Sequence, residues 1–214
     1  MSGPGRIVIL NGAPRSGKSS IAAVIQQDFP GAWMNLGVDV HATQITPPRL
    51  RPGIGLRPGP DRPEVAALVP TLYAALYESI AAHSRLGLNV VADVGHHVAA
   101  PAGQALLADC ARRLAGLPVL FVGVHCPIET IMQRRAAGQA GRDGVYLAGS
   151  PAEPVPAPVL RWQNAVHIPG VYDLEVDTSL LTPQGCAECI RARLEPEALP
   201  PGAFERLAAR ADVT

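Results

Sequence analysis

The sequence predicts an α/β fold in which a parallel sheet is covered on both faces by helices. Short runs rich in Val, Ile and Leu alternate along the chain with longer segments of helical character, and Gly or Pro stands at many junctions. The first apolar run leads directly into a glycine-rich turn and then into a helical segment. Such alternation is typical of a buried parallel sheet, because each crossover helix packs against one of its faces.

The individual elements follow from apolar periodicity and from the residues that start and stop helices. Pro30 ends the first helix, and Pro127 stands in the first turn of another, where proline suits helical geometry. The expected strands are 6–10, 33–38, 89–93, 119–124 and 172–176. The expected helices are 18–28, 64–85, 101–114, 127–137 and 183–194. For the tail, 195–214, a helix packed on the domain and a partner contact both stay open.

The chain is expected to form one domain over residues 1–214, since this length suits a single hydrophobic core. Two segments rich in Pro and Gly, 46–63 and 150–158, interrupt the alternation and are expected to be irregular. Insertions at the carboxyl ends of strands surround the ligand crevice of a doubly wound sheet. We therefore expect a substrate-side insert at about 42–63 and a lid at about 134–158. Solvated loops without function are the alternative.

Composition points to a small partner. Lys and Arg total 18, as do Asp and Glu, so no basic field is expected to attract nucleic acid or an anionic membrane. The first residues do not read as a signal peptide, and no apolar run approaches the roughly 20 residues that a bilayer requires. We therefore expect a cytoplasmic protein with reduced thiols at its four cysteines. A homo-oligomer stays possible.

A phosphate-binding motif follows the first expected strand. The residues Gly12-Ala13-Pro14-Arg15-Ser16-Gly17-Lys18-Ser19 match G-x-x-x-x-G-K-[ST] without a gap, and Ser20 continues into the helix. Backbone N–H groups of such a loop, together with the helix dipole, bind phosphates. Lys18 would reach the β- and γ-phosphates of ATP, and Ser19 would offer its hydroxyl to Mg²⁺. A chance resemblance is disfavoured because both flanking elements are of the required type.

Two aspartates are candidates for the chemistry of phosphoryl transfer. Asp39 follows the second expected strand, where it would face the crevice and act as the base that accepts the proton of the acceptor hydroxyl. Asp93 ends the third expected strand, a position typical of a carboxylate that serves the metal. The reverse assignment stays open, and Asp39 could instead cap the strand.

Three arginines are candidates for a mobile lid. Arg134, Arg135 and Arg142 cluster around Gly138 and Gly141, as expected of guanidinium groups that close over phosphates. Arg134 is assigned to the nucleotide, and Arg135 and Arg142 to the transferring phosphate. A solvated basic helix end is the alternative.

Several other side chains have no settled role. His96 and His97 follow the third expected strand, and a general acid, a substrate contact and a loop surface all stay open. Tyr73 and Tyr77 have helical spacing, which favours core packing over ligand stacking, and Trp162 is a further candidate for the pocket.

The chain resembles the chloramphenicol phosphotransferase family over most of residues 6–190. The resemblance rests on the phosphate-binding loop, on Gly37-Val38-Asp39, on Ala92-Asp93-Val94 and on Val122-Gly123-Val124-His125-Cys126, with a later pattern at Gln163, Val166-His167 and 172–178. It implies a three-layer P-loop NTPase fold like that of nucleotide kinases. It also implies transfer of the γ-phosphate of ATP, with Mg²⁺, to a primary hydroxyl, with Asp39 as the base.

The expected function is therefore that of an ATP-dependent O-phosphotransferase acting on a small hydroxylated molecule, such as chloramphenicol or a related metabolite. A P-loop kinase of a sugar, nucleoside or other metabolite would use the same machinery with a different pocket. A regulatory protein that binds nucleotide without transferring phosphate would need Lys18 and Ser19 but no base.

Overall fold

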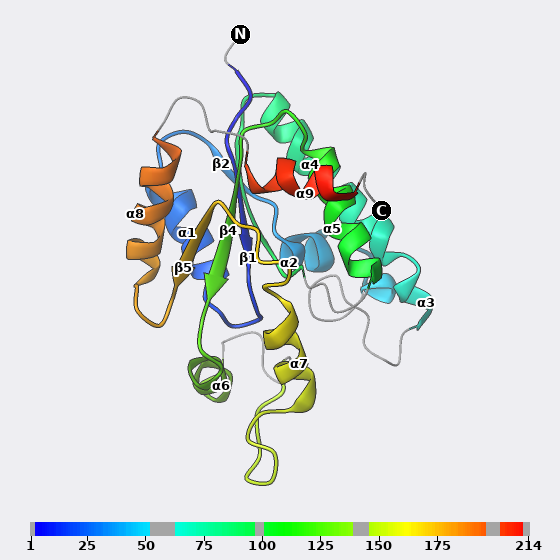
Figure 1. Ribbon diagram of the computed structural model, residues 1–214, viewed down its shortest axis with the longest axis vertical. Helices are drawn as coiled ribbons and strands as arrows, with labels where there is room; N and C mark the ends of the chain where they lie inside the picture. Colours follow the sequence, from blue (N-terminus) through cyan, green and yellow to red (C-terminus); the bar gives the residue numbers. More distant parts are fainter. Residues whose placement is uncertain (1–2, 52–62, 97–100, 139–145, 196–201, 212–214) are drawn as a thin grey trace.

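The computed structural model describes residues 3–51, 63–96, 101–138, 146–195 and 202–211, and Figure 1 shows their arrangement. Five strands form one parallel sheet in the order β2-β3-β1-β4-β5. The strands are β1 (Ile7–Asn11), β2 (Trp33–Asn35), β3 (Asn89–Val94), β4 (Val119–His125) and β5 (Leu174–Asp177). Because β1 lies centrally and pairs Asn11 with Val94 and Gly123, the loops that follow β1, β3 and β4 meet at one edge.

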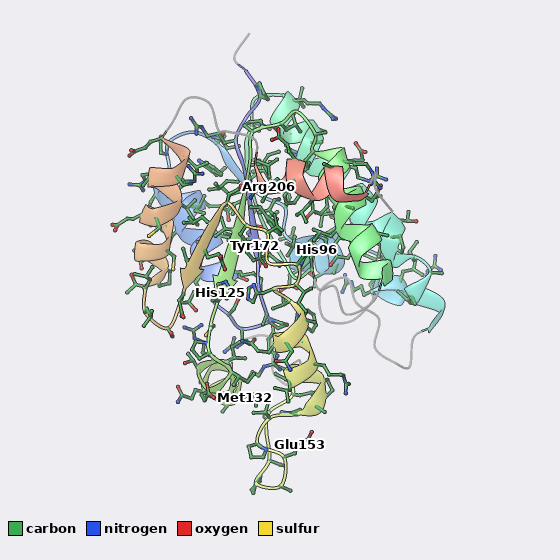
Figure 2. The ribbon with its side chains drawn as sticks, viewed as in Figure 1. His96, His125, Met132, Glu153, Tyr172 and Arg206 are labelled. Atoms are coloured by element: carbon green, nitrogen blue, oxygen red, sulfur yellow. The ribbon has the colours of Figure 1, made fainter. Side chains whose placement is uncertain are left out.

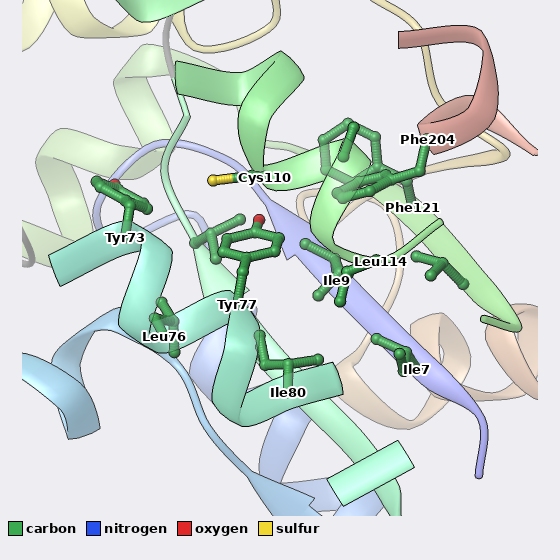
Figure 3. Close-up of a cluster of buried hydrophobic side chains, with 14 of the residues drawn as sticks. Ile7, Ile9, Tyr73, Leu76, Tyr77, Ile80, Cys110, Leu114, Phe121 and Phe204 are labelled. Carbon is green, nitrogen blue, oxygen red and sulfur yellow. The ribbon is translucent and has the colours of Figure 1, made fainter. Parts of the chain in front are cut away.

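Helices cover both faces of the sheet, as the alternation predicted. One face packs against α1 (Lys18–Asp28) and α8 (Pro183–Leu194). The other packs against α4 (Val69–Arg85), α5 (Pro101–Arg113) and α9 (Ala203–Ala211). Figure 3 shows the second core, where the rings of Tyr77, Phe121 and Phe204 come together beside Ile9. Burying these rings away from water stabilises the fold, since each aromatic side chain removes a large apolar area.

The remaining elements surround the carboxyl edge of the sheet. A short helix α2 (Val38–Val40) continues into a π-helical turn at His41–Ile45, followed by a 3₁₀ turn at Pro48–Leu50 and by α3 (Pro63–Ala66). The helices α6 (Ile128–Ala136) and α7 (Ala157–Ala165) project beyond the edge (Figure 1). Figure 2 places Met132 on α6 and Glu153 in the loop before α7. None of the helices in the described ranges has the length and hydropathy that crossing a membrane requires.

The helices expected at 18–28 and 183–194 are confirmed, and four of the five strands lie within two residues of their expected bounds. The second strand is shorter than expected, because Gly37 N donates to Asn35 Oδ1 at 3.1 Å and turns the chain into α2. The prediction of a single helix over 64–85 is wrong, because the chain forms two helices there, α3 and α4. Pro70 stands in the first turn of α4 and lacks the N–H that a continuous helix would require.

The segment 150–158 is irregular only up to Pro156, after which α7 begins. Pro158 lies in the first turn of α7, a position that tolerates proline, so this helix was missed. The tail contains α9, whose Ala203, Phe204 and Leu207 are buried in the second core. Part of the expected insert, residues 52–62, lies outside the described residues.

Candidate active site

The phosphate-binding loop connects β1 to α1, as its motif predicted. Arg15 and Gly17 adopt left-handed backbone angles, with φ of 72° and 100°. Gly12 is required by close approach, since a Cβ there would lie 2.4 Å from the carbonyl oxygen of Val124. The loop therefore has the tight, strained geometry with which such loops turn their amide groups toward phosphates.

Polar groups of this loop fit an anionic ligand. The hydroxyl oxygen of Ser16 is buried and has no hydrogen-bond partner among the described residues. Lys18 Nζ donates to the carbonyl oxygens of Gly12 and Ala13, each at 2.8 Å. A buried hydroxyl and an ammonium over the same loop, at the start of α1, are the groups that triphosphate oxygens need.

A pair of oxygen donors lies next to the loop. Ser19 Oγ donates to Asp93 Oδ2 at 2.7 Å, and Asp93 is buried. The backbone of Gly37 closes over this carboxylate, because a Cβ at Gly37 would lie 1.7 Å from Asp93 Oδ1. Hydroxyl and carboxylate oxygens are the ligands that Mg²⁺ prefers, so these residues fit that ion.

One cavity joins the loop to both aspartates. Asp39, on α2, faces it together with Asp93, so the structure brings together the two carboxylates that sequence placed after different strands. Apolar and aromatic side chains line it as well. The lining residues are Gly12, Pro14, Arg15, Lys18, Ser19, Val38, Asp39, Tyr73, Asp93, Val94, Gly95, Tyr146 and Trp162.

Two arginines near the loop, Arg15 and Arg134, anchor neighbouring segments of the chain. Arg134 donates to Thr178 Oγ1 at 3.0 Å and to its carbonyl oxygen at 2.9 Å, which joins α6 to the loop after β5. Arg15 Nη2 donates to the carbonyl oxygens of Arg134 and Gly138. A second hollow beside the loop is lined by Arg134, Leu181 and Pro183, among others, and lies where the rest of a nucleotide could extend.

Arg135 is buried, and its guanidinium carbon lies 5.4 Å from the centre of the Tyr146 ring. Its Nε atom has no hydrogen-bond partner within the described part of the chain. Burial lowers the pKa of Arg135, although an arginine keeps its charge in proteins. A buried cation with an unused donor suits a phosphate oxygen. Arg142, the third arginine of the expected lid, lies outside the described residues.

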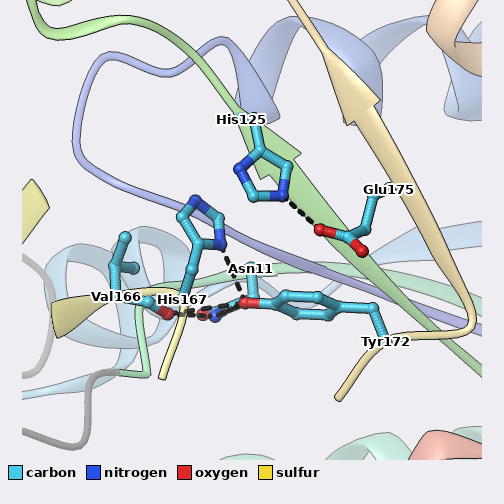
Figure 4. Close-up of polar contacts among 6 residues, drawn as sticks. All are labelled: Asn11, His125, Val166, His167, Tyr172 and Glu175. Atoms are coloured by element: carbon cyan, nitrogen blue, oxygen red, sulfur yellow. Dashed lines mark hydrogen bonds and ion pairs between the residues drawn. The ribbon is translucent and has the colours of Figure 1, made fainter. Parts of the chain in front are cut away.

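Sequence reasoning missed a polar network that joins the loops at this edge. Asn11 Nδ2 donates to the Val166 carbonyl and to Tyr172 Oη, each at 2.9 Å, and Asn11 Oδ1 accepts from His96 N at 2.7 Å. Tyr172 Oη is 2.9 Å from His167 Nδ1 (Figure 4). A polar residue at the end of an apolar strand was a usable signal for Asn11. His96, His167 and Tyr172 stood out in the sequence, but no local pattern indicated that they join one network.

The histidines of this region differ in environment. His96 is buried, so the loop-surface alternative is wrong for it, and His97 lies outside the described residues. Burial, followed by the nearby His125 and Lys18, lowers the pKa of His167 to about 4. Its ring stacks on that of His125, with centroids 3.9 Å apart, and His125 Nε2 is 2.6 Å from Glu175 Oε2. His167 is therefore neutral at pH 7.

A phosphate-binding loop after the central strand of a five-stranded parallel sheet, with a paired serine and aspartate beside it, is the arrangement of P-loop nucleotide-binding proteins. Comparison with known proteins gives the family. Residues 5–195 match the model of the chloramphenicol phosphotransferase-like proteins, and the chain belongs to this family. Two curated proteins of Mycobacterium tuberculosis that bear the name O-phosphotransferase are each 26% identical over 195 residues, covering 82% of this chain and 76% of theirs.

Solved structures agree on the fold. A sugar kinase from Janibacter has a TM-score of 0.58 at 17% identity, covering 96% of this chain and 99% of its own. The tunicamycin resistance protein of Deinococcus radiodurans also has a TM-score of 0.58 at 17% identity, covering 92% and 99%. The APS kinase of Mycobacterium tuberculosis, in complex with AMPPNP and APS, has a TM-score of 0.56 at 15% identity, covering 89% and 98%. The family and the fold together identify a small-molecule kinase.

Proposed function

We propose that this protein transfers the γ-phosphate of ATP to a hydroxyl of a small molecule. One observation carries the proposal: Lys18 and Ser19 share a single cavity with Asp39, and apolar and aromatic side chains also line it. A protein that only senses nucleotide has no need of a second carboxylate in an open cavity beside the phosphates. A transferase needs that carboxylate to orient the acceptor hydroxyl.

Each candidate side chain has a proposed role, which for Arg142 rests on the sequence alone because this residue lies outside the described ranges. Lys18 binds the phosphates, and Ser16 offers them a buried hydroxyl. Asp39 orients the acceptor hydroxyl and receives its proton late in the transfer, so its position matters more than a raised pKa. Arg135 and Arg142 balance charge on the transferring group, and Arg134 holds α6 against the nucleotide side.

Ser19 and Asp93 would hold Mg²⁺, because their oxygens already lie 2.7 Å apart beside the loop. The ion, when bound, offsets the charge that develops on phosphate oxygens during transfer. Asp39 is then left for the acceptor. This division favours Asp93 as the metal-side carboxylate and Asp39 as the base.

The first acceptor to test is an antibiotic with a free hydroxyl. The name of the family refers to chloramphenicol phosphotransferase, and one solved structure of the same fold is a tunicamycin resistance protein. Sugar and metabolite kinases share the fold too, so a sugar, nucleoside or other metabolite is the second class to test.

The test incubates the protein with Mg-ATP and a panel of hydroxylated compounds, chloramphenicol included, and searches by mass spectrometry for products heavier by one phosphoryl group. The variant is Asp39→Asn, and the matched control is Asp28→Asn, an exposed aspartate at the end of α1. We expect a product that Asp39→Asn abolishes while ATP binding persists and Asp28→Asn leaves the product unchanged.

Other outcomes are equally informative. Loss of ATP binding in Asp39→Asn would assign this residue to the metal. No product from the unaltered protein across the panel, with ATP bound normally, would reject an antibiotic acceptor and favour a metabolite kinase or a nucleotide-binding regulator.

A further inference from the structure

His96 is held at the point where β3 meets the cavity. Its ring nitrogen Nε2 lies 2.8 Å from Tyr77 Oη, and its ring packs on that of Tyr73 with centroids 4.9 Å apart. Only 4% of His96 is exposed. Its backbone N–H donates to Asn11, so both the backbone and the ring of His96 are held in place. Figure 2 shows His96 in the middle of the molecule, between the helices and the sheet edge.

Two residues next to His96 line the cavity. Tyr73 lines the cavity directly. Gly95, the residue before His96, is packed against Trp162, because a Cβ there would lie 3.2 Å from Trp162 Cζ2. A displacement of His96 would therefore disturb Tyr73 directly and Trp162 through Gly95. We infer that these two aromatic residues contact the acceptor.

The C-terminal helix supports His96 from behind. Phe204 of α9 lies parallel to Tyr77, with centroids 6.2 Å apart, and meets Phe121 edge-on at 4.8 Å (Figure 3). Burial raises the pKa of Tyr77 well above its usual value, so its hydroxyl keeps its proton for the contact with His96. Buried rings packed in this way have few alternative positions.

The sheet in turn fixes the start of α9. Asp173 Oδ1 accepts from Ala203 N at 2.6 Å, and Arg206 Nη2 donates to the Tyr172 carbonyl at 3.2 Å. The family match ends at residue 195, whereas α9 begins at Ala203. A helix outside the matched region is thus connected through Phe204 and Tyr77 to His96, whose neighbours Tyr73 and Gly95 line the cavity.

We propose that His96 is a positioning residue for the acceptor side of the cavity, and that α9 holds it in place through Phe204 and Tyr77. The kinetic form of this inference rests on the proposed phosphotransferase activity. The C-terminal helix then governs how the acceptor is held and leaves nucleotide binding alone.

The decisive variant is Tyr77→Phe, which removes one hydroxyl and keeps the ring stacked on Phe204. We expect the KM for the acceptor to rise roughly five- to tenfold, because a buried hydrogen bond to His96 is lost. The dissociation constant for ATP should stay within about twofold, since the phosphate-binding loop is unaffected. Phe204→Leu should act in the same direction.

The matched control is Ile190→Val, which removes one methylene from the core on the opposite face of the sheet. It should lower Tm to a similar extent as Tyr77→Phe without changing the KM for the acceptor. A Tyr77→Phe protein that loses only Tm, as the control does, would overturn the positioning role.

A second measurement does not depend on catalysis. The chain has two tryptophans, so Trp33→Phe leaves Trp162 as the only one, and Trp162 touches Gly95. In this background we expect acrylamide to quench Trp162 at least about twofold more strongly in Tyr77→Phe than in the protein without that substitution, because a loosened wall admits solvent. Ile190→Val should leave the quenching of Trp162 unchanged. Unchanged quenching in Tyr77→Phe would overturn the proposal. If the unaltered protein phosphorylates no acceptor, the proposed function fails, and quenching alone decides on His96.

Discussion

Gly37 offers the sharpest test of the site, because it controls the carboxylate of Asp93 without being a chemical participant. Its backbone lies directly over that carboxylate, and Ser19 holds the other oxygen at 2.7 Å. The backbone angle at Gly37 is φ −62°, which any residue can adopt. The substitution Gly37→Ala therefore adds one methyl group and no backbone strain, so its effect comes from contact alone.

The magnitude follows from the distances. The new Cβ would lie 1.7 Å from Asp93 Oδ1, whereas ordinary contact begins at 3.4 Å. The two atoms must separate by the difference of about 1.7 Å, either by moving α2 or by turning the carboxylate away from Ser19. A misplacement of about 1 Å in a catalytic constellation can cost about 100-fold in rate. We therefore expect kcat to fall by about 100-fold, equivalent to about 2.7 kcal/mol.

The assay compares kcat, and the Mg²⁺ concentration that gives half of it, for the unaltered protein, Gly37→Ala and the control Gly3→Ala. No atom lies within 4 Å of a Cβ at Gly3, so that control should match the unaltered protein. Gly37→Ala should require a higher Mg²⁺ concentration to reach half of its kcat. Its affinity for ATP in the absence of metal should stay within about threefold of that of the unaltered protein. If Gly37→Ala keeps the normal kcat and Mg²⁺ requirement, then Asp93 does not serve the metal from the position described.

Two further outcomes test the electrostatics. His167 has a folded-state pKa of about 4 against 6.5 for an ordinary histidine, so the unfolded chain takes up its proton first as pH falls. Stability should then decline from pH 6.5 to 4, by about 2 kcal/mol for a half-buried ring, and chemical denaturation should show a flatter profile for His167→Asn. Arg135→Lys keeps the charge but loses the planar fork beside Tyr146, so kcat should fall at least about tenfold with little change in ATP affinity, and an unaltered kcat would remove Arg135 from the phosphate site.

The nucleotide side of the site could be predicted from the sequence because its geometry is local. The angles of Arg15 and Gly17 belong to a contiguous motif, and the helix that follows begins within it. The helix at 183–194 was equally readable, since Thr182 caps it by accepting from Gly185 N at 3.1 Å. Parallel strands end at one edge, so Asp39 and Asp93 could be expected in one crevice.

Prolines misled the reading of α7. Three of them, at positions 154, 156 and 158, suggested an irregular segment, yet proline before a helix or in its first turn leaves all the required hydrogen bonds intact. The helix matters for the site because it carries Trp162 into the cavity. A proline in the sequence indicates where a helix cannot continue, but it does not indicate whether a new helix begins directly after it.

The acceptor side is built from contacts that no local pattern encodes. Trp162 meets Gly95 across 67 positions of the chain, and Phe204 packs on Tyr77, which in turn contacts His96. Such contacts depend on how complete helices pack, and packing tolerates many sequences of similar volume. The two halves of the cavity are therefore under different constraints. We expect a substitution in the loop from Gly12 to Ser19 to change the affinity for nucleotide directly. A substitution in α9 should instead change the KM for the acceptor and leave the affinity for nucleotide as it was.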